Sequence, residues 1–341
     1  MTGPIHITTF PSRGGRPLHQ NRLNLLRTIE SRRRSKAILY ATGDRPGLET
    51  EITGQVYEYF VDILERFGEV HRISLVLYTQ GGDHLTAWSL VNLIRQYCKR
   101  FEVILPAKAH DAGTLLSLGA DCILMTKQAT LSAIEPSVES PLNPDFGEDL
   151  MRHAIPLNEE TIHNYLDFAL AQIGEHDPHV IKDLILDVAN KIHPLVLGEA
   201  YRAAAQLQAV ATKLLHGAGV EESAIDKIVS FLCSESGHRY LLHRNEAHSL
   251  GLPVEKPHET LCTEIKTLHR DVADELALRQ SWKPDLERDI HEHDTFHYTT
   301  ALLESTAGLS WRYAIEGDFL RLNNTYEAHR TFEGWKPQTP S

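Results

Sequence analysis

Cysteine and long apolar runs are scarce in this chain of 341 residues. Its four cysteines, at positions 98, 122, 233 and 262, lie far apart and form no CxxC pair. This spacing argues against a disulfide framework and a structural zinc site, and it predicts reduced thiols.

No apolar run reaches the roughly 18 residues that a membrane-spanning helix needs. The opening residues, MTGPIHITTFPSRGGRP, also lack the apolar stretch that is typical of a secretory signal. We therefore expect a cytoplasmic protein that has no membrane partner.

The overall composition is that of an ordinary globular protein. Hydrophobic residues make up 42% of the chain, charged residues 23% and aromatic residues 7%, which excludes a disordered, collagenous or low-complexity chain. At about 100–200 residues per domain, the length predicts two or three compact units.

The formal net charge of -12 is unevenly distributed along the chain. Residues 13–36 carry a formal charge of +7, because their single acid, Glu30, stands against eight basic residues. These are Arg13, Arg16, Arg22, Arg27, Arg32, Arg33, Arg34 and Lys36. The sequence thus predicts a basic N-terminal arm over residues 1–36 and an acidic body, which disfavours nonspecific binding of nucleic acid. Docking to a neighbouring subunit or plain solvation is favoured for the arm, because no aromatic residue interrupts its basic part to stack on bases.

An α/β core is predicted over residues 37–145. Short apolar runs at residues 37–42, 73–79, 101–106 and 121–126 are typical of buried parallel strands. Amphipathic helical segments separate them, and such a series predicts a parallel sheet that is covered by helices on its faces.

The rest of the chain is expected to divide into two further segments. Residues 146–262 predict a helical extension that completes the core, with helices at 159–173, 180–192, 198–215, 223–232 and 245–250, the last of them capped by Gly251. Residues 263–341 predict a C-terminal helix at 265–278, a β-hairpin in HYTTALLESTAGLSWRYAIEG, and a loose tail, GWKPQTPS.

Two strand ends carry unusual local sequences. TQGGD, residues 79–83, has two glycines that let backbone N–H groups approach a ligand, and Asp83 can cap the helix that follows. KAHDAGT, residues 108–114, leads from a strand into a helix whose first N–H groups suit an anion or a developing oxyanion. Because ligands of open α/β sheets bind outside the carboxyl ends of the strands, the functional site is expected there.

Together these segments resemble the Clp-protease/crotonase fold. YTQGGD, VNLIRQYC, KAHDAGTLLSLGAD and LMTKQATLSAIEPSV, with KIHPLVLGEAYR and HRNEAHSLGLPVE further on, are similar to the serine dehydrogenase proteinase family, which is related to the signal peptide peptidase A type of serine protease. The resemblance covers roughly residues 36–256. It implies a peptidase with peptide or protein substrates, no cofactor and a homo-oligomeric assembly. It also implies an oxyanion hole made by the backbone N–H groups of Gly81 or Gly82 and of Ala112.

The nucleophile position departs from the family pattern, because Asp111 stands where the family has serine. A carboxylate is a poor acyl-transfer nucleophile near neutral pH, and its charge repels an oxyanion about 4 Å away by roughly 4 kcal/mol at an effective dielectric constant of 20. The sequence therefore predicts an inactive or impaired peptidase. The alternative for Asp111 is an ordinary helix N-cap, a position that aspartate strongly favours.

The general base stays open among three residues. Lys191 and His193 lie in the family-like segment NKIHPLVLG, and His110 is adjacent to the nucleophile position. Each has a structural alternative, such as a solvated lysine or a hydrogen-bonded histidine. Thr114 and Ser117 are candidate replacement hydroxyls, although Thr114 is expected to cap or pack.

Two other functions are weighed against the peptidase. A noncatalytic assembly or regulatory protein would keep the fold to bind peptides or partners. A weaker hypothesis uses Asp111 as an acid, base or nucleophile on an acyl thioester. A metal site at His291, His293, Asp294 and His297 is disfavoured, because the spacing matches no strong metal signature.

Overall fold

The computed structural model describes residues 18–135, 167–168, 171, 178–233, 240–282, 295–322 and 325–338. The chain divides into two compact units. The first comprises residues 1–131 and 242–341, and the second comprises residues 132–241. The predicted N-terminal arm and C-terminal addition both belong to the first unit, so the units do not coincide with the four predicted segments.

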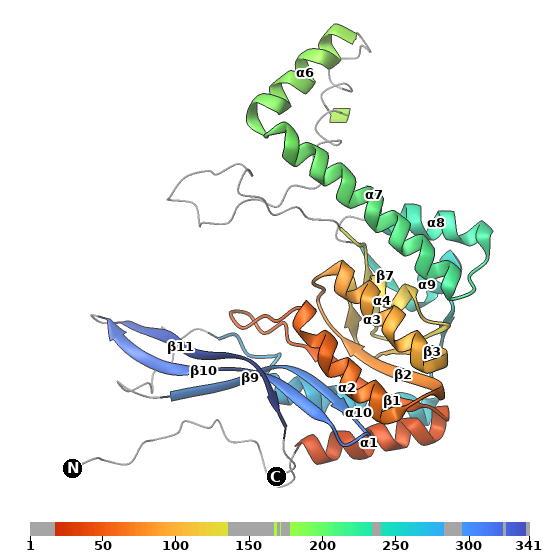
Figure 1. Ribbon diagram of the computed structural model, residues 1–341, viewed down its shortest axis with the longest axis vertical. Helices are drawn as coiled ribbons and strands as arrows, with labels where there is room; N and C mark the ends of the chain where they lie inside the picture. The colour runs from red at the N-terminus through yellow and green to blue at the C-terminus, as the bar shows by residue number, and fades with distance from the viewer. Residues whose placement is uncertain are drawn as a thin grey trace. The chain divides into compact units, whose positions relative to one another are not determined.

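The first unit is a mixed α/β structure built on an eight-stranded sheet (Figure 1). The strand order is β11-β10-β9-β1-β2-β3-β5-β8, in which β1, β2, β3, β5 and β8 are parallel and β9, β10 and β11 are antiparallel. Its strands are β1 (Lys36–Thr42), β2 (Val70–Tyr78), β3 (Cys98–Leu105), β5 (Cys122–Met125), β8 (Val254–Glu255), β9 (Thr295–Ser305), β10 (Ser310–Leu322) and β11 (Thr325–Pro337). The predicted α/β class and the four predicted parallel strands are confirmed.

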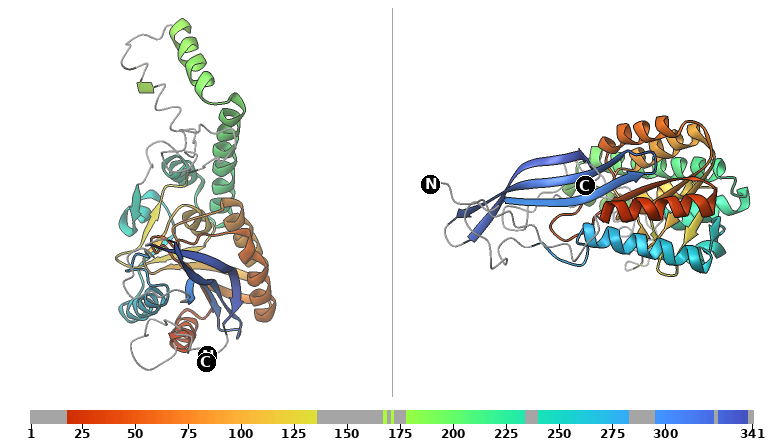
Figure 2. Two further views of the ribbon diagram at one scale, coloured as in Figure 1. Left: turned by 90° about the vertical axis from the view of Figure 1, so that its left-hand side faces the viewer. Right: turned by 90° about the horizontal axis from the view of Figure 1, so that it is seen from below.

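Helices cover both faces of this sheet (Figure 2). Helices α1 (Leu18–Arg33) and α10 (Glu259–Glu275) lie on one face, where Leu26, Ile265 and Leu268 join Leu39 and Val76 of the sheet in one buried cluster. Helices α2 (Tyr57–Phe67) and α3 (His84–Tyr97) lie on the other face.

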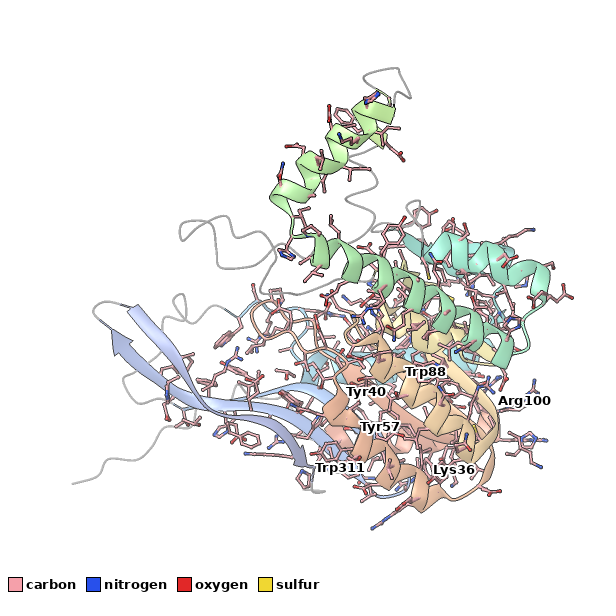
Figure 3. The ribbon with its side chains drawn as sticks, turned by 45° about the horizontal axis from the view of Figure 1, so that its top comes forward. Lys36, Tyr40, Tyr57, Trp88, Arg100 and Trp311 are labelled. Carbon is pink, nitrogen blue, oxygen red and sulfur yellow. The ribbon has the colours of Figure 1, made fainter. Side chains whose placement is uncertain are left out.

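The alternation of side chains along β1 explains how it packs against both layers. Leu39 belongs to the cluster under α1 and α10, whereas Tyr40 points to the opposite face. There its ring packs edge-on against Phe60 of α2 with ring centroids 5.5 Å apart. Figure 3 labels Tyr40 together with Tyr57, the first residue of α2. Burial with no polar partner raises the pKa of the Tyr40 phenol to well above its usual range.

Further short elements lie within the first unit or where the chain passes between the two units. They are the 3-10 helix η1 (Gly54–Val56), β4 (Lys108–Ala109), α4 (Ala112–Leu118), β6 (Thr130–Ser132), β7 (Leu241–His243) and α9 (Arg244–Leu250). Strands β4, β6 and β7 form a small second sheet in that order. Gly251 ends α9 in a left-handed conformation with φ 107°, as predicted.

The second unit is helical in the part that the structure describes. It contains α6 (Pro178–Lys191), α7 (Pro194–Gly217) and α8 (Glu222–Leu232), close to the predicted ranges. The predicted helix at 159–173 lies almost entirely outside the described residues. No helix in the described ranges is both long and apolar enough to cross a membrane.

The C-terminal hairpin is confirmed as β9 and β10, but the expectation of a loose tail after it is wrong for residues 334–337. These residues are the end of β11, which pairs along its whole length with β10. Alternation in the segment TYEAHRTFEGW is typical of a strand, and the partner strand supplies the hydrogen bonds. Residues 339–341 lie outside the described chain.

The basic arm also differs from the expectation of a segment free to dock elsewhere. Residues 18–33 form α1, and Arg22 of this helix has a fully buried side chain. The Arg22 guanidinium donates to both carboxylate oxygens of the buried Glu304 on β9, with Nη2 2.6 Å from Oε1 and Nε 2.9 Å from Oε2. Burial would raise the pKa of Glu304, but the bonds from His19 and Arg22 outweigh it and hold that pKa below its usual value.

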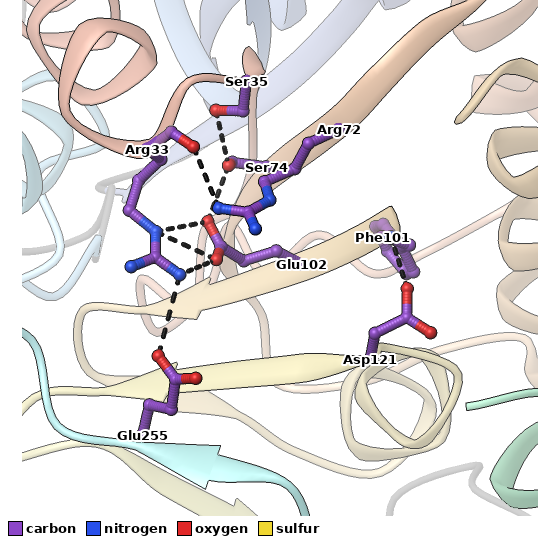
Figure 4. A network of polar contacts seen from close by, with 8 residues as sticks. All are labelled: Arg33, Ser35, Arg72, Ser74, Phe101, Glu102, Asp121 and Glu255. Atoms are coloured by element: carbon purple, nitrogen blue, oxygen red, sulfur yellow. Dashed lines mark hydrogen bonds and ion pairs between the residues drawn. The ribbon is translucent and has the colours of Figure 1, made fainter. Parts of the chain in front are cut away.

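Arg33, at the end of α1, anchors a second buried carboxylate (Figure 4). Its Nε lies 2.9 Å from Oε2 of Glu102 on β3, and the hydroxyl of Ser74 on β2 donates to Oε1 of the same carboxylate at 2.7 Å. Glu102 is 2% exposed. Two basic residues of the arm, Arg22 and Arg33, therefore form ion pairs inside the first unit and join α1 to the sheet.

We predict that Arg22→Ala lowers the free energy of unfolding by about 3–5 kcal/mol, because it leaves the Glu304 carboxylate buried without its cation. Urea denaturation followed by circular dichroism measures this loss. Arg32 is the matched control, since it donates to both oxygens of Glu264 from the same helix but is 43% exposed. Arg32→Ala should leave the unfolding midpoint almost unchanged, because solvent screens an exposed ion pair.

An equal loss in the two variants would contradict this role of Arg22. If Arg22→Ala does not fold, the double variant Arg22→Met with Glu304→Leu provides the test. It removes both charges at once and should recover most of the stability, because no buried charge is then left unpaired.

Candidate active site

The Gly81–Gly82 turn after β2 is fixed by close backbone packing. Ile52 N–H donates to Gly81 O, and Asp83 N–H donates to Ile52 O, both at 2.8 Å. Gly82 has φ 132°, and a Cβ added there would lie 2.3 Å from Ile52 O. Only glycine fits this position, which explains why the turn needs the residue that the sequence places there.

Asp83 starts α3 as predicted. Its carboxylate accepts a hydrogen bond from the backbone N–H of Thr86, which satisfies one of the donors at the start of the helix. This cap fixes the direction of α3 and so places His84, the first helical residue, beside the Gly81–Gly82 turn.

Asp111 stands at the start of α4 in a strained backbone conformation. Its φ is 50° and its ψ is -114°, a region that residues with a Cβ rarely occupy. Its carbonyl accepts from Leu115 N at 3.0 Å, but its side chain makes no capping hydrogen bond with the helix. Asp111 therefore occupies the N-cap position of α4, as the alternative expected, but its carboxylate does not cap the helix.

The Asp111 carboxylate faces the Gly81–Gly82 turn and α3 instead. Its Oδ1 lies 2.6 Å from Nε2 of His84, and its Oδ2 accepts from Gly82 N–H at 3.4 Å. A Cβ added to Gly81 would lie 2.7 Å from Oδ2, so Gly81 must also be glycine for the two turns to approach. The side chains of His84 and Asp111 are 22% and 30% exposed, which leaves the pair accessible to solvent.

The structure thus brings together Asp111, Gly81 and Gly82 of the predicted site. Ala112, the other predicted oxyanion donor, is the first residue of α4, where backbone N–H groups have no partner within the helix. The sequence reasoning missed His84. The sequence feature that could have indicated His84 is its position in GGDH, directly after the Gly81–Gly82 turn, where its side chain lies near the carboxyl end of β2.

His110 is adjacent to Asp111 in the chain but bonds elsewhere. Its Nε2 lies 2.9 Å from the hydroxyl oxygen of Thr130. Burial, with a smaller effect from the nearby Lys108 charge, lowers the pKa of His110 to about 4. The imidazole is therefore neutral at neutral pH.

The predicted replacement hydroxyls are both buried and bonded to the backbone. Thr114 Oγ1 donates to Ala109 O at 2.9 Å, and Ser117 Oγ donates to Gly113 O at 2.8 Å. Neither geometry presents a hydroxyl to a substrate, and the full burial of Thr114 agrees with the expectation that it packs.

Lys191 and His193 belong to the second unit. Lys191 ends α6, and His193 is the N-cap of α7, where its Nδ1 accepts from Leu195 N–H at 3.2 Å. A hydrogen-bonded histidine at the helix start was the structural alternative for His193. Their assignment as a general base stays a prediction.

A second polar cluster at the carboxyl edge of the sheet was also missed. Asp44, after β1, forms an ion pair with Lys108 and accepts from the hydroxyl of Tyr78 and the amide of Gln80, each at 2.9 Å. Burial would raise the pKa of Asp44, but these bonds lower it below its usual value. Lys108, the lysine of KAHDAGT, is thus held as the partner of a carboxylate.

Within the described ranges, no group of three or more His, Cys, Asp or Glu side chains could hold a metal ion. Three members of the histidine-rich stretch, His291, His293 and Asp294, lie outside these ranges. His297 is on β9, where its Nδ1 lies 3.5 Å from Oε1 of Glu316.

We predict that Asp111→Gly unfolds at a higher denaturant concentration than Asp111→Ala. Both variants lose the carboxylate, but only glycine relieves the positive φ, whose strain is worth roughly 1–3 kcal/mol. Glycine itself costs about 0.5–1 kcal/mol of chain entropy, and the midpoints of these two ranges leave a net gain of about 1 kcal/mol. Equal unfolding midpoints would show that residue 111 is not strained.

We predict that His110 makes stability fall as the pH is lowered from about 6.5 to about 4. In this window the unfolded chain binds a proton at His110 and the folded chain does not, so acid favours unfolding. Urea denaturation at several pH values should show a shallower decrease in His110→Gln, which does not titrate. The same slope in both proteins would contradict the neutral, buried state of His110.

Comparisons with known proteins give distant similarities. No protein-family model matches the chain. It is 27% identical over 90 residues to Uncharacterized protein MJ1495 of Methanocaldococcus jannaschii, covering 26% of this chain and 31% of that protein. It is 33% identical over 66 residues to Uncharacterized protein MJ0137 of the same organism, covering 19% and 23%. The matches thus span less than a third of the length of these relatives.

Among solved structures, the chain is similar to a mutant of the 1510-N membrane-bound stomatin-specific protease, with 16% identity and a TM-score of 0.37. That match covers 63% of this chain and 79% of the other. A second similarity is to the ClpP protease catalytic domain from Plasmodium falciparum, with 10% identity, coverage of 75% and 100%, and a TM-score of 0.34. At these identities and TM-scores, the function of the chain has to be inferred from its own residues.

Proposed function

We propose that this chain is a serine-peptidase-like protein of the serine dehydrogenase proteinase family, with a Clp-protease/crotonase-like core, in which Asp111 occupies the position of the nucleophile. The observation that carries this proposal is the backbone of Asp111, which has a positive φ at the start of α4 and faces the Gly81–Gly82 turn. A sharp, strained turn from strand to helix is how several hydrolases expose a nucleophile beside its oxyanion donors.

The arrangement of donors supports an acyl-binding site. Gly82 N–H points at the side chain of residue 111, and Ala112 supplies a first-turn N–H from the helix that residue 111 begins. Backbone donors of this kind stabilise the negative charge that develops on a carbonyl oxygen. We therefore assign peptide or protein segments as the ligands of this site.

Asp111 removes serine-type chemistry from this site for two reasons. It lacks a hydroxyl nucleophile, and its Oδ2 accepts from the same Gly82 N–H that an oxyanion would use. The carboxylate of residue 111 therefore competes with the transition state for one donor, which typically contributes about 2.7–4 kcal/mol. We propose an impaired peptidase that can assemble with further copies of itself.

The test is covalent labelling with a fluorophosphonate probe, which reacts with activated serine hydroxyls. The unaltered chain should not label, and Asp111→Ser should label at residue 111, because the variant places a hydroxyl next to Gly82 N–H and His84. Intact-mass spectrometry with peptide mapping measures the site of modification.

Asp111→Ala is the matched control and should stay unlabelled. Cleavage of an unfolded protein substrate by Asp111→Ser would extend the result from reactivity to peptidase activity. Labelling of the unaltered chain at Thr114 or Ser117 would overturn the proposal, as would an Asp111→Ser variant that folds but reacts no faster than Asp111→Ala.

A further inference from the structure

His84 and Asp111 form a close pair at the exposed edge of the site. Their contact of 2.6 Å, between Nε2 and Oδ1, joins the first residue of α3 to the residue that begins α4. Both side chains are partly accessible, at 22% and 30%. The serine-type function assigned to the site treats Asp111 only as a replaced nucleophile, so the close contact of its carboxylate with His84 requires its own explanation.

The pairing fixes the chemical state of the imidazole. A neutral histidine has one N–H donor and one acceptor nitrogen, and the carboxylate of Asp111 favours the tautomer in which Nε2 carries the proton. Nδ1 is then the basic nitrogen. No hydrogen bond to Nδ1 of His84 occurs among the described residues, and this nitrogen remains available to accept a proton.

The neighbouring backbone donor is held only weakly. Gly82 N–H reaches Oδ2 of Asp111 at 3.4 Å, longer than the usual 2.7–3.2 Å of an N–H···O bond. The stronger partner of the carboxylate is His84, at 2.6 Å. A substrate carbonyl can therefore take over the Gly82 donor while Asp111 stays bound to the imidazole.

We propose that His84 and Asp111 are a general-base dyad that activates a water molecule to hydrolyse an acyl ester or thioester. This inference rests on the proposed function for the oxyanion donors at Gly82 and Ala112 and adds a different way of attacking the carbonyl. His84 is the catalytic base, and Asp111 is a positioning residue that orients the ring and stabilises its protonated form.

The reaction balances with water as the only co-substrate. Nδ1 of His84 takes a proton from water while the water oxygen bonds to the carbonyl carbon, whose oxygen becomes negative beside Gly82 N–H. The tetrahedral intermediate collapses, the bond from carbon to the leaving oxygen or sulfur breaks, and His84 returns its proton to that atom. The products are a carboxylic acid and an alcohol or thiol.

The dyad also changes the electrostatic effect of Asp111. A lone carboxylate would repel the developing oxyanion, as the sequence predicts. Once His84 has taken the proton of water, however, the imidazolium and the carboxylate form a neutral pair. The site then holds the same charges as a serine–histidine–aspartate triad at the corresponding step.

The experiment measures hydrolysis of p-nitrophenyl butyrate by the unaltered full-length chain, with an equal concentration of free imidazole as background. His84→Gln and Asp111→Asn should each lower the rate by about 10²–10⁴-fold, the usual contribution of general-base catalysis. His71→Gln is the matched control and should retain the rate, because His71 is exposed near the amino end of β2, away from the site. The time course should show no burst, since no acyl-enzyme forms.

Two outcomes would overturn the dyad. One is a rate for the unaltered chain no greater than that of free imidazole, and the other is full activity in a folded His84→Gln variant. If His84→Gln does not fold, the pH profile of the unaltered chain decides, because general-base catalysis makes the rate rise with pH and then level off. A rate that does not depend on pH would contradict general-base catalysis.

The two proposals fail separately. If Asp111→Ser labels with the fluorophosphonate but the unaltered chain does not hydrolyse the ester, the dyad is refuted and the peptidase-like site stands. If the ester is hydrolysed through His84 but Asp111→Ser does not label, the dyad stands and the serine-peptidase-like assignment is refuted.

Discussion

The close approach of two turns determines the geometry of this site. Residue 111 lies against the Gly81–Gly82 turn so closely that a Cβ on Gly81 would meet its carboxylate, and a Cβ on Gly82 would meet Ile52 on the other side. The glycine turn is thus packed from two directions. Because these close neighbours leave no room for the turn to shift, the contacts of Gly82 N–H are set by the positions of Ile52 and Asp111.

This constraint connects the site to the far end of the sequence. Two backbone hydrogen bonds hold the loop that carries Ile52. Gly43 N–H, at the start of the loop, donates to Thr300 O of β9 at 2.7 Å, and Pro46 O accepts from Trp282 N–H at 2.9 Å. Strand β9 in turn binds α1 through Glu304 and Arg22. The C-terminal strands therefore support the loop that positions the glycine turn, rather than forming a separate addition to the α/β core.

Local patterns in the sequence predict most of the fold, whereas contacts between distant residues account for what they miss. The parallel strands, the cap at Asp83 and the end of α9 at Gly251 each follow from a few adjacent residues. The sequence around Arg22 gives no sign that its side chain is buried, because its partner Glu304 is 282 positions away. The same holds for the site. GGDH and KAHDAGT indicate the correct strand ends, but no local rule reveals that His84 contacts Asp111 across 27 positions.

The strain at Asp111 bears on whether this position still has a function. Strained backbone conformations cost roughly 1–3 kcal/mol each and persist only where the surrounding structure imposes them. Glycine would relieve that strain, and a residue kept only to begin a helix would use its side chain as a cap. Asp111 does neither, since its carboxylate bonds to His84 and to the glycine turn instead. The chain thus keeps a strained strand-to-helix turn and places a charged side chain on it. Chemistry or binding at residue 111 explains this combination better than the stability of the fold does.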